Sequence, residues 1–152
     1  MISSNGTNRT LDIVKSGGYV TNGGDVQIYS PIDPIAQEWF IIPLGTNTFK
    51  VVPRTNMTLA LSTVGTSNGS SAGRTSTSTG NADVGTYTGS NNQKWYFYSS
   101  TGSFISYNLN SDLSDGEYYF NNESTGKFLR ENNFSTLNAS SGTLVTLGNS
   151  IR

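Results

Sequence analysis

The segment Gln37-Glu38-Trp39-Phe40-Ile41-Ile42-Pro43 decides the predicted fold, because it returns as Gln93-Lys94-Trp95-Tyr96-Phe97-Tyr98. Each copy places a glutamine two residues before a tryptophan and then continues as a short apolar strand. The two copies lie 56 residues apart. Self-similarity at a fixed spacing of this size indicates a repeated structural unit. Gln37, Trp39, Gln93 and Trp95 are therefore expected to fix equivalent hairpins and to belong to the core.

The sequence around both copies repeats as well. Each unit reads as short strands separated by turns rich in Gly, Asn and Ser, and no segment shows a convincing helical period. The matching strands are 10–13 with 58–61, 26–29 with 84–87, 39–43 with 95–98, and 49–53 with 104–107. Four short strands per unit predict an all-β protein with the β-trefoil fold. The three expected units span about 1–45, 46–100 and 101–152 of a single domain, which suits the length of 152 residues.

The third unit lacks the Gln-x-Trp triplet, is expected to be degenerate, and allows two registers. In the first, its four strands are 103–108, 117–121, 127–131 and 143–147. In the second, the unit begins at Asp115-Gly116-Glu117 and continues through Lys127-Phe128-Leu129. The closing strand would then fall beyond residues 149–152, and the trefoil would be permuted or completed by a neighbour. We favour the first register.

The two Gln-x-Trp triplets, each preceded by its own strand set, resemble the ricin-B-type β-trefoil lectins, which include modules of bacterial toxins, haemagglutinins and glycosidases. The resemblance covers the first two thirds of the chain well and the last third poorly. It implies a carbohydrate-binding module that recognises galactose or N-acetylgalactosamine. Plant members often carry disulfides between strands, whereas this chain has no cysteine.

Composition excludes several classes of function. Only 12% of residues are charged and the formal net charge is −1, so the chain offers no basic surface for nucleic acid. The absence of cysteine and histidine removes thiolate ligands, the usual zinc ligands and the commonest general base. We therefore expect no enzyme, no metal and no cofactor. A pair such as Asp112 and Asp115 would be needed as the carboxylates of a glycosidase, but both fall in a serine-rich turn.

A sugar-binding protein must offer fixed hydrogen-bond partners for hydroxyl groups and a flat apolar surface for the C–H face of the ring. A carboxylate can accept from two hydroxyls, and an aromatic ring supplies the flat surface. Strand alternation points Asp12 away from the core. The resemblance implies that Asp12 holds the sugar hydroxyls, with Gln27 beside it and Tyr29 as the stacking ring at the rim.

Departures from the family pattern qualify each predicted site. Ala36 stands where the family has an asparagine, and we expect either a water or Asn22 from the facing loop to replace it. The second unit keeps Tyr87 and Asn92 but has Ala60 at the position matched to Asp12, so we expect a degenerate site. The third unit has Arg130 at that position in the second register, and we expect no ricin-type binding there.

The stretch 65–82, rich in Gly, Ser and Thr with Arg74 at its middle, is expected to be a long mobile loop. It motivates the alternative function of an interaction or protease-inhibitor protein acting through that loop. The leading expectation is a secreted or extracellular lectin, whose export route this sequence does not show. Its partners would be glycans of cell-surface glycoproteins or glycolipids, and the sequence has no apolar run of membrane-spanning length. Because single sugar pockets bind weakly, we expect a homo-oligomer or a part of a larger toxin or enzyme assembly.

Overall fold

The computed structural model describes residues 2, 8–32, 34–45, 47–63, 82–106, 116–131 and 143–148. Within these ranges it contains ten short strands and almost no helix, as the sequence predicts. The strands are β1 (Thr10–Ile13), β2 (Gly24–Tyr29), β3 (Trp39–Pro43), β4 (Phe49–Pro53), β5 (Leu59–Ser62), β6 (Asp83–Thr86), β7 (Trp95–Ser99), β8 (Tyr118–Asn122), β9 (Phe128–Glu131) and β10 (Thr143–Gly148). A single helical turn, α1 (Pro34–Gln37), and a 3-10 turn, η1 (Asn91–Gln93), each precede a tryptophan-led strand.

Three antiparallel hairpins form one half of the fold. They are β1 with β2, β5 with β6, and β9 with β10, and β2 also pairs with both β6 and β10. The connection from β1 to β2 contains a tight turn in which Gly17 and Gly18 have φ of 58° and 86°. Consecutive positive φ values are typical of a type I′ turn, which suits the twist of a hairpin and favours glycine. We call these three pairs the cap hairpins.

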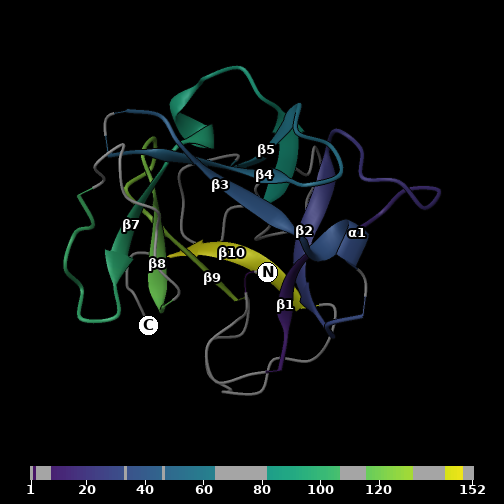
Figure 1. Ribbon diagram of the computed structural model, residues 1–152, viewed down its shortest axis with the longest axis horizontal. Helices are drawn as coiled ribbons and strands as arrows, with labels where there is room; N and C mark the ends of the chain where they lie inside the picture. Colours follow the sequence, from purple (N-terminus) through teal and green to yellow (C-terminus); the bar gives the residue numbers. More distant parts are fainter. Residues whose placement is uncertain are drawn as a thin grey trace.

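The other half consists of two further hairpins, β3 with β4 and β7 with β8, which we call the barrel hairpins. They are joined where Phe49 pairs with Trp95. Figure 1 shows β3 beside β4 and β7 beside β8. β1 and β2 lie on the side of the molecule away from β7 and β8. Cap and barrel hairpins alternate along the chain, which is the topology of a β-trefoil. The predicted fold class is confirmed.

The core lies between the cap and barrel hairpins. Its largest side chain is Trp95, which is completely buried. The ring of Phe97 stacks on Phe49 with centroids 4.6 Å apart and on Phe120 at 4.4 Å. These rings come from β4, β7 and β8, so they tie the barrel hairpins to each other. Burial of aromatic side chains of this size is a dominant stabilising contribution in a small β domain.

The two Gln-x-Trp triplets occupy equivalent positions. The indole N–H of Trp39 donates to the carbonyl of Leu11, and that of Trp95 donates to the carbonyl of Leu61, each at 3.0 Å. Both tryptophans thereby attach the start of a barrel strand to the middle of a cap strand. Because a buried carbonyl without a partner is costly, these contacts fix the register of the cap strand against the barrel.

The glutamines of the triplets hold the second strands of the first two cap hairpins. The side-chain amide of Gln37 donates to the carbonyl of Ser30 at 2.8 Å, and that of Gln93 donates to the carbonyl of Thr86 at 2.9 Å. Gln37 is completely buried and Gln93 is 4% exposed. The hydrogen bonds show why the motif requires glutamine, since its planar amide both donates and accepts within a closed space.

The favoured register of the third unit is wrong. Phe104 does not begin that unit, because it forms one isolated bridge with Tyr98 as the chain folds back on β7. The strand that pairs along the whole of β7 is β8, with Trp95 opposite Asn122 just as Trp39 lies opposite Pro53. β8, β9 and β10 are thus the first three strands of the unit, as in the second register. The local sequence resembles a strand here, because apolar residues follow the turn near Ser103.

Several expectations fall on residues outside the described ranges. These include residues 65–81 of the predicted loop, Asp112, Asp115, and residues 149–152 after β10.

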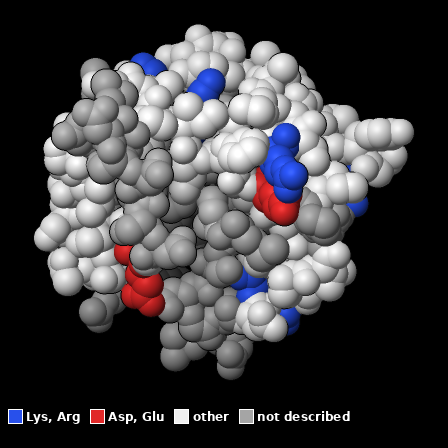
Figure 2. Space-filling view, in the orientation of Figure 1, with Lys and Arg blue, Asp and Glu red and all other residues white. Residues whose placement is uncertain are grey.

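Figure 2 shows that few charged side chains appear on one face of the described surface, in keeping with the 12% of charged residues. Within the described part, no helix has the length and apolar character needed to cross a membrane.

Candidate functional site

The predicted sugar-binding residues of the first unit lie on one face of the first cap hairpin. In the β1–β2 register, Asp12 lies opposite Gln27, and Thr10 lies opposite Tyr29. Side chains of directly opposite residues project from the same side of the sheet, and side chains two residues apart on a strand share that side. Asp12, Gln27 and Tyr29 therefore share the face opposite the core. The structure brings these three predicted residues together, and we call this group the Tyr29 site.

The carboxylate of Asp12 is less accessible than the sequence suggests. The amide Nε2 of Gln27 donates to Oδ2 of Asp12 at 2.7 Å, and Asp12 is only 6% exposed. Asp12 points away from the core, as predicted, but it is covered, because strand alternation determines the direction of a side chain and not its exposure. Gln27 and Tyr29 are half-buried and are the more accessible members of the group. Asp12 fixes the Gln27 amide, whose carbonyl oxygen remains an acceptor.

The helical turn α1, just before Trp39, packs against the first cap hairpin. α1 packs against β1, and Ala36 within it is 1% exposed. The position where the resembling lectins have an asparagine is therefore a closed apolar position here. Asn92, the residue before the glutamine of the second unit, donates from its side chain to the carbonyl of Thr63 at 3.0 Å. The structure thus gives Asn92 a role in holding the end of β5.

Asn22 connects two cap hairpins. Its side-chain oxygen accepts from the backbone N–H of Thr86 at 2.8 Å. This contact links the turn before β2 to β6 of the second unit, where β2 and β6 also pair through Gly24 and Val84. The expected part of Asn22 in a first-unit sugar site stays a prediction, while its described contact is structural.

The second unit carries different residues at the equivalent positions. Because Trp95 bonds Leu61 as Trp39 bonds Leu11, Ser62 corresponds to Asp12. The earlier match of Ala60 to Asp12 is wrong by two residues, since the connections between strands differ in length. The register of β5 with β6 then places Asp83 opposite Ser62, where the first unit has Gln27 opposite Asp12.

Gly85 occupies the position of Tyr29 in the second unit, and the surrounding space explains the glycine. A Cβ atom on Gly85 would lie 3.1 Å from the hydroxyl of Ser62 and 3.5 Å from the amide nitrogen of Gln93. A side chain at this position would therefore require Ser62 to shift by a few tenths of an ångström. Tyr87 lies two residues farther along, and the ammonium of Lys50 sits 4.5 Å from the centre of its ring. A cation over the ring face competes with stacking of a sugar on that face.

Asp83 is a buried acid of the second cap hairpin. It is 7% exposed, and its Oδ1 has no hydrogen-bond partner among the described residues. Asp25 lies directly opposite it in the β2–β6 register. Burial, together with the negative charge of Asp25, raises the pKa of Asp83 to about 6. No local sequence pattern predicts this pair, because the two acids lie 58 positions apart.

Two other predicted features have limited structural description. Arg130 lies on β9 opposite Thr146, at the position that corresponds to Asp12, and its side chain lies outside the described part. The expected lack of ricin-type binding in the third unit stays a prediction. In the portion of the chain that the structure describes, no three Asp or Glu side chains come together as metal ligands.

Comparisons with known proteins agree with the fold. No protein-family model matches the chain, and no curated protein sequence matches it. Three solved structures are similar over 95% or more of this chain. A designed threefold-symmetric protein, ThreeFoil, is 22% identical with a TM-score of 0.64, and the match covers 85% of that protein. A mosquitocidal holotoxin is 23% identical with a TM-score of 0.63. An exo-β-1,3-galactanase from Clostridium thermocellum is 18% identical with a TM-score of 0.66. The chain spans 15% of the holotoxin and 26% of the galactanase.

Proposed function

We propose that this chain is a carbohydrate-binding module of the ricin-B type that binds galactose-type glycans at the Tyr29 site. The observation that carries the proposal is the 2.7 Å hydrogen bond from Gln27 to Asp12, on the hairpin face that also carries Tyr29. In this arrangement Gln27 accepts from a sugar hydroxyl, Tyr29 stacks on the apolar face of the ring, and Asp12 positions Gln27. The similarity to a galactanase motivates the choice of galactose as the first probe.

The first test is binding of galactose and N-acetylgalactosamine to the chain, measured by NMR titration after a glycan array. A single shallow site of this kind is expected to have a dissociation constant on the order of millimolar, which corresponds to about 4 kcal/mol. Tyr29→Ala should weaken binding at least tenfold, whereas Tyr29→Phe should retain most of it. Gln27→Ala should also weaken binding, because it removes the accepting amide.

Tyr87→Ala is the matched control. Tyr87 is a half-buried tyrosine in the second unit, but Lys50 covers its ring, so its loss should leave galactose affinity unchanged. Equal effects of Tyr29→Ala and Tyr87→Ala would reject the assignment of the site. A chain that binds none of the array glycans would reject the function.

The same proposal extends to the biological setting. A chain that matches 15% of a toxin and 26% of a glycosidase is proposed to be an extracellular targeting part of such a protein, or a homo-oligomer. Several weak sites held together give the avidity that one lacks. The alternative of an interaction or inhibitor protein depends on residues 65–81, which lie outside the described ranges.

A further inference from the structure

The two barrel hairpins carry an ion pair at the same place with opposite polarity. The residue before each tryptophan of the triplets faces the residue that follows the partner strand. In the first barrel hairpin Arg54 pairs with Glu38, and in the second Glu123 pairs with Lys94. The backbone confirms the equivalence, because the N–H groups of Arg54 and Glu123 donate to the carbonyls of Glu38 and Lys94, each at 2.9 Å.

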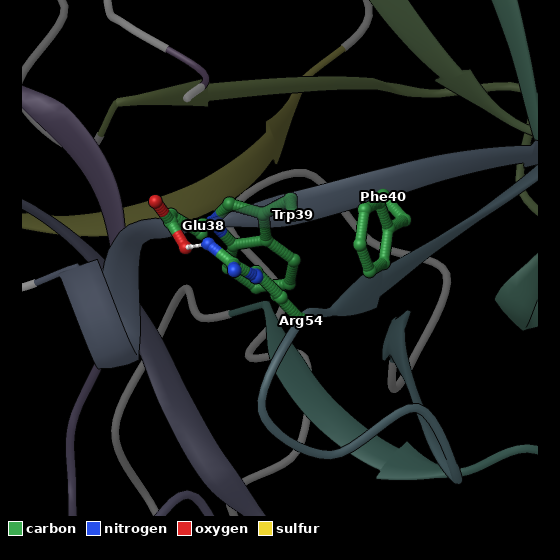
Figure 3. A pocket seen from close by; sticks show the side chains of 4 residues that line it. All are labelled: Glu38, Trp39, Phe40 and Arg54. Atoms are coloured by element: carbon green, nitrogen blue, oxygen red, sulfur yellow. Dashed lines mark hydrogen bonds and ion pairs between the residues drawn. The ribbon is translucent and has the colours of Figure 1, made fainter.

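The first of these pairs borders an open depression. Glu38, Trp39, Phe40 and Arg54 line it, and Figure 3 shows Glu38 and Arg54 joined beside Trp39, with Phe40 farther along β3. The Arg54 side chain is 60% exposed, that of Glu38 is 32% exposed, and Phe40 is 43% exposed. Glu38 and Phe40 are two residues apart in extended chain, so their side chains project from the same face. We call Glu38, Phe40 and Arg54 the Arg54 site.

The second barrel hairpin is closed by its own side chains. Tyr96 takes the position of Phe40, and its hydroxyl donates to Glu123 at 3.2 Å. The ring of Phe104 then packs on Tyr96 with centroids 5.7 Å apart. Burial and the neighbouring charge of Glu123 hold the pKa of Tyr96 above its usual value. Among the described residues, no aromatic ring covers Phe40 in this way. The equivalent surface of the first barrel hairpin is therefore accessible to a ligand.

We propose that the Arg54 site binds one ring of a neutral saccharide, separately from the Tyr29 site. Glu38 accepts from one hydroxyl, Arg54 donates to an adjacent hydroxyl oxygen, and the face of Phe40 receives the apolar side of the ring. Arg54 has five N–H donors, so the ion pair with Glu38 leaves donors for the sugar. Because Glu38 neutralises Arg54, an acidic sugar would gain no net attraction and would meet the charge of Glu38. This inference rests on the proposed carbohydrate-binding function.

The test uses the full chain and galactose as the neutral probe, with galacturonate as the acidic one. NMR titration with assigned Phe40, Arg54 and Tyr29 signals should reveal two binding events for galactose. Phe40→Ala and Arg54→Gln should each weaken the event at the Arg54 site at least tenfold and leave that at Tyr29 unchanged. Because the Arg54 side chain is exposed, Arg54→Gln should fold normally. It therefore tests the site even if Phe40→Ala fails to fold. Galacturonate should bind the Arg54 site more weakly than galactose.

Lys94→Gln is the matched control, because it breaks the equivalent ion pair where Tyr96 and Phe104 close the surface. It should leave both binding events unchanged. Galactose shifts confined to the Tyr29 site, or unaltered binding in Phe40→Ala and Arg54→Gln, would overturn this inference and leave the proposed function standing. Shifts confined to the Arg54 site would instead support the inference and reject the Tyr29 site. Preferential binding of galacturonate would overturn the choice of a neutral saccharide.

Discussion

Asp83→Asn should stabilise the protein at neutral pH and remove a specific part of its pH dependence. Asp83 lies between Asp25 and Ser62 on neighbouring strands and is 7% exposed. The backbone N–H of Val26 donates to the carbonyl of Ala82, so Asp25 and Asp83 form the closer, non-hydrogen-bonded type of antiparallel pair. Like charges placed directly opposite in a sheet are destabilising. Ionisation of Asp83 therefore costs free energy in the folded state.

The magnitude follows from the pKa. Burial, with the charge of Asp25, raises the pKa of Asp83 from 3.8 to about 6 in the folded protein. Each pKa unit is worth about 1.4 kcal/mol, so ionisation weakens the folded state by about 3 kcal/mol. Below pH 3.8 the carboxyl is protonated in both states and the penalty is absent. As the pH rises from 3.8 to about 6, the carboxyl of Asp83 ionises first in the unfolded state. The free energy of unfolding therefore falls progressively over this pH range.

Urea unfolding followed by tryptophan fluorescence measures this effect. Wild type and Asp83→Asn should have similar free energies of unfolding at pH 3.5, whereas at pH 7.5 the variant should be more stable by about 3 kcal/mol. Asp25→Asn is the control, and it should relieve only a minor part of the penalty because burial is the larger cause. A stability difference between wild type and Asp83→Asn that is the same at both pH values would refute the reasoning.

Two further substitutions test the Gln-x-Trp frame by urea unfolding at pH 7.5. Trp95→Phe removes the indole donor from the carbonyl of Leu61 and leaves a cavity, so it should cost about 3 kcal/mol, with an unchanged stability counting against the frame. Gln93→Glu keeps the shape but replaces the donor to the carbonyl of Thr86 with a carboxylate, which should destabilise by about 2–4 kcal/mol. Glutamate tolerated at this position would mean that the hydrogen bond at 2.9 Å does not hold the cap strand.

The fold could be predicted from the sequence because the two Gln-x-Trp triplets occupy equivalent positions in two repeated units. Trp39 and Trp95 each bond a cap-strand carbonyl, so their spacing carries information on the whole unit. The third unit has no such marker, and an apolar strand signal near Phe104 cannot be told from the true first strand β8 by alternation. Pairing of β8 with β7 is a long-range property, and local pattern does not determine it.

The candidate site is readable only in part, for a similar reason. Alternation correctly places Asp12, Gln27 and Tyr29 on one face, since a strand has a strict period of two. It does not report what covers that face, and Asp12 is 6% exposed. Sequence alignment also fails where connections change length, which is why Ala60 was matched to a position that Ser62 occupies. The ion pair of Glu38 and Arg54 depends on hairpin register and leaves no trace in local sequence.

The equivalent frames also explain why the second unit should lack counterparts of the Tyr29 and Arg54 sites. The frame requires only a glutamine, a tryptophan and two cap strands, so the remaining positions are free to differ. Where the first unit has Tyr29, the second has Gly85, whose Cβ would meet Ser62 at 3.1 Å. Where the first barrel hairpin has an uncovered Phe40, the second has Tyr96 beneath Phe104. In both halves of the second unit the chain fills with its own side chains the space that a ligand would take. Within the first two units, multivalency would therefore come from the Tyr29 and Arg54 sites acting together, and not from repetition of one site.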